Sequence, residues 1–127
     1  ARGLTAAGSY DVVIGSYEDV GRKDHAGSVT VANFTRALYR TYTQDTKGIP
    51  GSAETEDNFG SAIGLLPTNP KIDTLLIGAP TENTGTCSRG GYVIRSDGRK
   101  LSSRTAWTSV PPPDCDSFGV WGWTFGD

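Results

Sequence analysis

The chain of 127 residues lacks the features that mark several classes of protein. No apolar run approaches the roughly 20 residues that a membrane-spanning helix needs, and no signal peptide is found at its start, so we expect no membrane span. Its 12 Lys and Arg are balanced by 14 Asp and Glu, and no basic cluster stands out. This balance disfavours nucleic acid as a partner. Methionine is absent, which is typical of a processed or excised chain.

Residues that commonly carry catalysis are also scarce. The single histidine, His25, stands in a polar stretch beside Asp24, so we interpret it as a solvated loop residue rather than a general base. Glu54, Glu56 and Asp57 could supply paired carboxylates for glycoside hydrolysis, but they lie in a long irregular connection where solvated carboxylates are the usual meaning. We therefore expect a protein without catalytic activity.

Glycine, proline and short apolar runs are abundant instead. Seventeen glycines and seven prolines indicate a turn-rich β protein. Residues 72–79 form an apolar run that ends in Gly78, Ala79 and Pro80, which is typical of a strand buried on both faces with a crowded far end. Residues 27–32 contain a Val-Thr-Val alternation that predicts a half-buried strand.

These strands recur at a nearly constant spacing. Residues 12–16 match residues 75–79, and Phe59-Gly60 matches Phe118-Gly119. The offsets are 63 and 59 positions. A period near 60 residues, built of short strands and glycine turns, indicates a β-propeller or a similar array. The domains that we predict are a lead-in at 1–9, a first unit at 10–66 and a second unit at 67–127, with the start of a third unit at the C-terminus.

The motif Phe59-Gly60 followed by the sequence LIGAP at 76–80 resembles the FG-GAP repeat of integrin α-chain β-propellers and of related bacterial secreted propellers. Residues 43–60 are similar to the inter-strand segment of the bacterial members. The resemblance implies an all-β fold with about two four-stranded antiparallel blades. Because propellers close with about 4 to 8 blades, it also implies further blades from the same parent or from other chains.

Two local predictions concern the strands of these units. We expect residues 59–66 to be the fourth strand that closes the first unit, followed by a tight loop at 67–71. We expect Ser96-Asp97-Gly98 to be a hairpin turn that joins residues 91–95 to residues 100–108.

Calcium is the cofactor that the resemblance suggests. The loop before the buried strand often binds Ca²⁺ in the family through converging oxygen ligands. Here only Asn69 and Asp73 remain as ligands, with Lys71 between them. Support for calcium is therefore weak, and we favour a loop held by turn hydrogen bonds.

The two cysteines, Cys87 and Cys115, lie in segments rich in turn residues. An even pair in such segments predicts a disulfide, and hence an extracellular, secreted or cell-surface location. Two unrelated free thiols are the alternative.

The aromatic residues are the candidates for ligand binding, because a flat apolar ring with a polar edge suits sugars. The four that we select are Tyr42, Trp107, Trp121 and Trp123. The alternative is that they fill space between blades, which the repeat spacing of Tyr42 and Trp107 also favours.

The function that we expect is a non-catalytic extracellular binding or scaffolding module that presents propeller loops to a protein or glycan. One alternative is a carbohydrate-binding lectin propeller. Another is an accessory propeller region of a secreted enzyme, in which the active site lies elsewhere.

Overall fold

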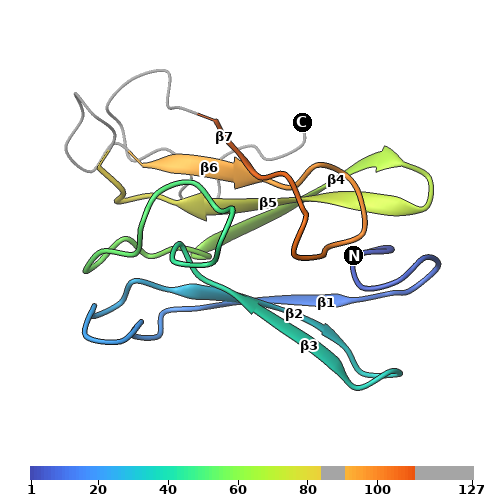
Figure 1. The fold of residues 1–127 in the computed structure, drawn as a ribbon, viewed down its shortest axis with the longest axis horizontal. Helices are drawn as coiled ribbons and strands as arrows, with labels where there is room; N and C mark the ends of the chain where they lie inside the picture. Colours follow the sequence, from blue (N-terminus) through green and yellow to red (C-terminus); the bar gives the residue numbers. More distant parts are fainter. Residues whose placement is uncertain (84–90, 111–127) are drawn as a thin grey trace.

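The structure is a computed structural model that describes residues 1–83 and 91–110 (Figure 1). Within these residues the chain forms seven strands in two antiparallel sheets, so the predicted all-β class is confirmed. The first sheet has the order β1-β2-β3 and the second has the order β4-β5-β6-β7. The strands are β1 (Val12–Ser16), β2 (Ser28–Asn33), β3 (Leu38–Tyr42), β4 (Ala62–Asn69), β5 (Ile72–Ala79), β6 (Tyr92–Arg95) and β7 (Thr108–Val110).

Each sheet has its most buried strand inside. In the first sheet β2 lies between β1 and β3, and Val29 and Val31 on one of its faces are fully buried. In the second sheet β5 lies between β4 and β6, and every residue from Asp73 to Ala79 is buried. The prediction that residues 72–79 form a strand buried on both faces is therefore confirmed.

The two sheets lie face to face as two layers, with β1–β3 in blue and green below β4–β7 in Figure 1, and one core fills the space between them. Val29, Val31 and Tyr42 enter this core from the first sheet, while Leu75 and Ile77 enter it from the second. The period of two along each strand places these side chains on one face of their sheet.

Phe59 and Gly60 lie at the junction of the two sheets. The Phe59 ring is fully buried in the core, and its backbone N–H donates to the Ala26 carbonyl at 2.9 Å. The Gly60 N–H donates to the Gly78 carbonyl at the end of β5, at 2.8 Å. Gly60 has a φ of +87°, and a Cβ at this position would lie 2.5 Å from the Ser28 carbonyl oxygen. Only glycine combines this backbone conformation with so close an approach.

The prediction that residues 59–66 form the strand that closes the first unit is wrong, because the strand after this junction belongs to the second sheet. β4 pairs with β5 in antiparallel register, from Ala62 opposite Gly78 to Asn69 opposite Ile72. The reason is the short connection at Pro70 and Lys71, which brings the chain directly back along β4. The predicted loop at 67–71 is thus mostly strand, with a register shift between Leu66 and Asn69. The predicted boundary between residues 66 and 67 falls inside β4.

The predicted hairpin at Ser96-Asp97-Gly98 is also wrong. β6 pairs with residues 108–110, with Arg95 opposite Thr108, so a long loop separates the two strands. The loop is drawn into the core by Leu101, which is fully buried and whose N–H donates to the Leu4 carbonyl at 2.8 Å.

The lead-in at 1–9 packs against the second sheet. Leu4 is fully buried in the core, and the Asp73 N–H donates to the Arg2 carbonyl at 2.9 Å. Residues 1–83 and 91–110 contain no helix that is long and apolar enough to cross a membrane.

The core predicts a difference between two isoleucines at equivalent repeat positions. Ile77 is fully buried, whereas Ile14, which lies 63 residues earlier in the sequence, is 45% exposed. Replacing Ile77 by Ala should lower the free energy of unfolding by about 2–5 kcal/mol because it leaves a cavity. Ile14→Ala, the matched control, should lower it by at most about 1 kcal/mol. Urea unfolding followed by circular dichroism measures both, and equal losses would contradict this core.

Candidate functional site

A cleft of about 310 Å³ opens where the end of β3 meets the loops that precede β4 and β7. It is bordered by two aromatic rings, two cations and a set of hydroxyl groups. The described residues that line it are Arg40, Thr41, Tyr42, Thr46, Lys47, Ser102, Ser103 and Trp107.

Tyr42 and Trp107 form the aromatic wall of this cleft. Their ring centroids lie 5.4 Å apart with an interplanar angle of 61°, an edge-to-face contact. Tyr42 comes from the first sheet, and Trp107 directly precedes β7 of the second. Trp107 is half-buried and packs against the core. Two of the four aromatic residues selected from the sequence are therefore brought together, and both line a cleft as well as filling space between the sheets.

The hydroxyl group of Tyr42 is buried and makes no hydrogen bond of normal geometry with the described residues, and the Arg40 side chain lies close to it. Burial raises the pKa of Tyr42, and the nearby Arg40 guanidinium lowers it in part. A buried hydroxyl without a well-formed hydrogen bond is unfavourable by roughly 1–3 kcal/mol, so a ligand that supplies a hydrogen bond here would be favoured.

Arg40 and Lys47 give the cleft its charge. Both side chains are exposed, and neither is in an ion pair within the part of the chain that the structure describes. The sequence analysis did not select them. A signal existed for Arg40, because residues two apart on a strand share a face and Arg40 is two positions from Tyr42. No pattern in the sequence distinguished Lys47.

Thr46 and Lys47 are held in place by the first turn of the loop at 43–57. The Thr43 N–H donates to Thr46 Oγ1 at 2.9 Å, and the Ile49 N–H donates to the Thr46 carbonyl at 3.1 Å. Ile49 is buried in the core and anchors the loop from below. The lip of the cleft is therefore an ordered turn.

Asp45 ties the same loop to the rest of the chain. Its carboxylate accepts the Ala53 N–H at 3.0 Å and forms an ion pair with Lys23, also at 3.0 Å. The hydrogen bond from the Ala53 N–H and the contact with Lys23 lower the pKa of Asp45. The carboxylate nearest to Lys47 in the sequence is thus occupied by partners outside the cleft.

A cluster of buried polar side chains lies under the loop. Gln44 donates from Nε2 to Glu82 Oε2 at 2.5 Å, and the Asp57 carboxylate accepts the Glu54 N–H at 2.6 Å. Burial raises the pKa of Glu82 to about 7, with the negative charges of Asp57 and Glu54 acting in the same direction. Burial also raises the pKa of Asp57. The two carboxyl groups therefore favour a shared proton, and their burial gives them a structural role rather than contact with a substrate.

The two residues considered for calcium have partners within the protein. The Asp73 carboxylate accepts the backbone N–H of Arg2 at 2.8 Å. It also accepts a hydrogen bond from the Arg2 guanidinium, with Nη2 to Oδ1 at 3.1 Å. Asn69 Oδ1 accepts the Lys71 N–H at 2.9 Å. A cation at this loop would have to displace Arg2 from Asp73. No group of three or more His, Cys, Asp or Glu suited to a metal occurs in residues 1–83 and 91–110.

Several sequence predictions lie outside the described residues. These are the disulfide between Cys87 and Cys115, the ligand-binding roles of Trp121 and Trp123, and the start of a third unit.

Comparisons with protein-family models, with curated proteins and with solved structures each gave no significant match. The resemblance to FG-GAP repeats therefore stays a prediction.

The buried carboxyl pair predicts that stability falls as the pH rises. The pKa of Glu82 is about 7 in the folded chain against an ordinary value of 4.5, so the folded state holds a proton that the unfolded state has released. The stabilisation is complete below pH 4.5 and is lost between pH 4.5 and about 7. The contribution of Glu82 to the free energy of unfolding should fall across this window by at most about 1.4 kcal/mol per pH unit.

Urea unfolding at several pH values measures this dependence, and Glu82→Gln is the control because it has no proton to lose. The lowered pKa values of Asp11 and Asp45 act below 3.8, outside this window, whereas the raised pKa of Asp57 acts above 3.8 and adds to the fall in stability. An unchanged slope in the Glu82→Gln chain would show that Glu82 is not the titrating group.

Proposed function

We propose that this chain is a non-catalytic binding module of an extracellular β-propeller and that its ligand is a glycan held in the cleft between Tyr42 and Trp107. The observation that carries the proposal is the combination of an aromatic wall with a rim of hydroxyl groups. Protein–sugar contacts use both, because one face of a sugar ring is apolar and its edge is polar.

The dimensions of the cleft agree with a small ligand. Its volume of about 310 Å³ lies at the lower end of the range of roughly 300–1,000 Å³ that is usual for ligand sites. Its walls come from three separate segments, two of which are loops held against a rigid two-sheet core. Binding residues on loops that a rigid scaffold positions are common in binding modules.

The outer face of the first sheet supports the propeller part of the proposal. Val12 and Ile14 occupy the repeat positions of Leu75 and Ile77, but they are 47% and 45% exposed while Leu75 and Ile77 are fully buried. The positions that face the core in the second sheet therefore face outward at the equivalent repeat positions of the first sheet. A further unit packed on Val12 and Ile14 would continue the same stacking, as in a propeller.

The extracellular location rests on the predicted disulfide and on the resemblance to secreted and integrin propellers.

The glycan proposal predicts that binding depends on Trp107. A printed array of neutral and acidic oligosaccharides should give signals with the 127-residue chain that Trp107→Ala weakens by about tenfold or more, because the ring no longer contacts the sugar. Trp107→Phe should retain part of the signal. The matched control is Tyr17→Ala, since Tyr17 is an exposed aromatic that does not line the cleft. No binding to any glycan, or equal loss in both alanine variants, would overturn the proposal.

The propeller proposal predicts that the outer face of the first sheet mediates association. Native mass spectrometry should show species heavier than a single 13.4 kDa chain, and Ile14→Asp should shift them to the single chain by placing a charge in the interface. Lys71→Asp, a charge change in the turn between β4 and β5, is the control. A single-chain mass for the unaltered protein would count against stacking of blades from separate chains.

A further inference from the structure

We propose that the ligand of the Tyr42–Trp107 cleft is an acidic sugar whose carboxylate or sulfate group binds between Arg40 and Lys47. This inference rests on the proposed function and names the class of glycan. The cleft combines a cavity, a buried hydroxyl without a well-formed hydrogen bond and cations as its only charged groups among the described lining residues.

The first argument is the charge of the cleft. Of its eight described lining residues, two are cations and none is a carboxylate. The nearby Asp45 is turned to other partners, namely the Ala53 N–H and Lys23. Arg40 and Lys47 therefore face the cleft without a compensating anion among the lining residues. An anionic group placed between them would gain charge-assisted hydrogen bonds, which are about twice as strong as neutral ones.

The second argument is the kind of hydrogen bond that the cleft offers. Sites for neutral sugars need strong acceptors for sugar hydroxyl groups, and these are usually carboxylates or side-chain amides. Neither type lines this cleft among the described residues. Its polar groups are guanidinium and ammonium donors and the hydroxyl groups of Thr41, Thr46, Ser102 and Ser103. The set favours a ligand rich in acceptor oxygens.

The third argument is the buried hydroxyl of Tyr42, which makes no hydrogen bond of normal geometry with the described residues and borders the cleft beside Arg40. An acceptor oxygen bound by Arg40 would lie close to this hydroxyl and could accept a hydrogen bond from it. The half-buried Trp107 ring provides the apolar surface for the sugar ring itself.

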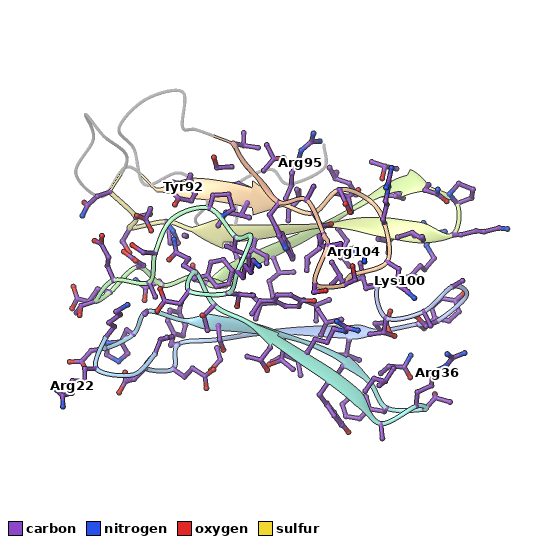
Figure 2. All side chains as sticks on the ribbon, in the orientation of Figure 1. Arg22, Arg36, Tyr92, Arg95, Lys100 and Arg104 are labelled. Atoms are coloured by element: carbon purple, nitrogen blue, oxygen red, sulfur yellow. The ribbon has the colours of Figure 1, made fainter. Side chains whose placement is uncertain are left out.

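An acidic peptide shares the negative charge but fits less well. The cleft has a volume of about 310 Å³, which suits one or two sugar rings rather than an extended peptide backbone. Figure 2 also shows Lys100 and Arg104 on the loop that carries Ser102 and Ser103. These cations extend the positive potential beyond the cleft, as suits a polymeric acidic glycan.

Isothermal titration calorimetry of the 127-residue chain tests the inference with four probes. They are tetragalacturonate, its fully methyl-esterified form, a sulfated galactose tetrasaccharide and tetraglutamate. We expect tetragalacturonate or the sulfated sugar to bind at least tenfold more tightly than the neutral methyl ester, with an affinity that falls as salt is added. Binding of neither anionic sugar, or equal binding of the methyl ester, would overturn the inference. Tighter binding of tetraglutamate would overturn it in favour of an acidic peptide.

Side-chain variants separate this inference from the proposed function. Arg40→Gln and Lys47→Gln should each weaken the acidic sugar about tenfold, while Arg36→Gln, in the turn between β2 and β3 at the end of β3 opposite to Tyr42 (Figure 2), should not. If neutral sugars bind in a Trp107-dependent manner and these variants have no effect, the binding module stands and its acidic specificity is wrong. If no sugar binds, both proposals fail.

Tyr42→Phe provides a readout that a purely structural role would not change. Removing a buried hydroxyl that makes no well-formed hydrogen bond should leave the melting temperature unchanged or raise it. The same change should weaken the acidic sugar severalfold, because the ligand loses a donor. Unchanged affinity in this variant would exclude the hydroxyl from the site.

Discussion

The contact on which the rest of the structure depends is the one that Phe59 and Gly60 make with the starts and ends of strands in both sheets. Phe59 fills the core and hydrogen-bonds to Ala26 just before β2, while Gly60 hydrogen-bonds to Gly78 at the end of β5. A single dipeptide thus fixes the separation of the sheets and the starting register of β4. Because interiors are close-packed, a side chain at position 60 could not be accommodated without moving the Ser28 backbone. The face-to-face arrangement that forms the core, and with it the cleft at its edge, follows from this junction.

The loop that leads to this junction joins the core to the cleft. One end carries Thr46 and Lys47 on the lip of the cleft, and the other covers the buried carboxyl groups of Asp57 and Glu82. Burying two carboxyl groups together is unfavourable unless a proton or a hydrogen-bond donor neutralises them, and Gln44 and a raised pKa for Glu82 meet this need. The polar cluster therefore has a clear structural role, and its titration near neutral pH is a consequence of burial. We propose that the exposed groups of the cleft, in contrast, contact a ligand.

Some of the strands and the apolar centre could be predicted from the sequence, because strand period and apolar runs are local properties. Residues 72–79 and the Val-Thr-Val segment of β2 were found in this way. The pairing of β4 was mispredicted, since the repeat spacing does not say on which side of a motif a unit begins. The hairpin at 96–98 was mispredicted because a local turn signal was outweighed by burial of Leu101, a contact with Leu4 that is distant in sequence. For the candidate site, two of the aromatic residues were found, but the cations beside them were not.

By itself, the sequence determined the all-β class, the location of the most apolar strand and the presence of Tyr42 and Trp107 at equivalent repeat positions. These depend on side-chain period and composition, which are readable along the chain. Only the tertiary structure decided that β4 belongs to the second sheet, that the Asp73 carboxylate is held by Arg2, and that Arg40 and Lys47 meet the two aromatic rings at one cleft. The physical reason is that each of these results joins residues far apart in the chain. Such contacts are set by the packing of one sheet on the other, and no local pattern encodes them.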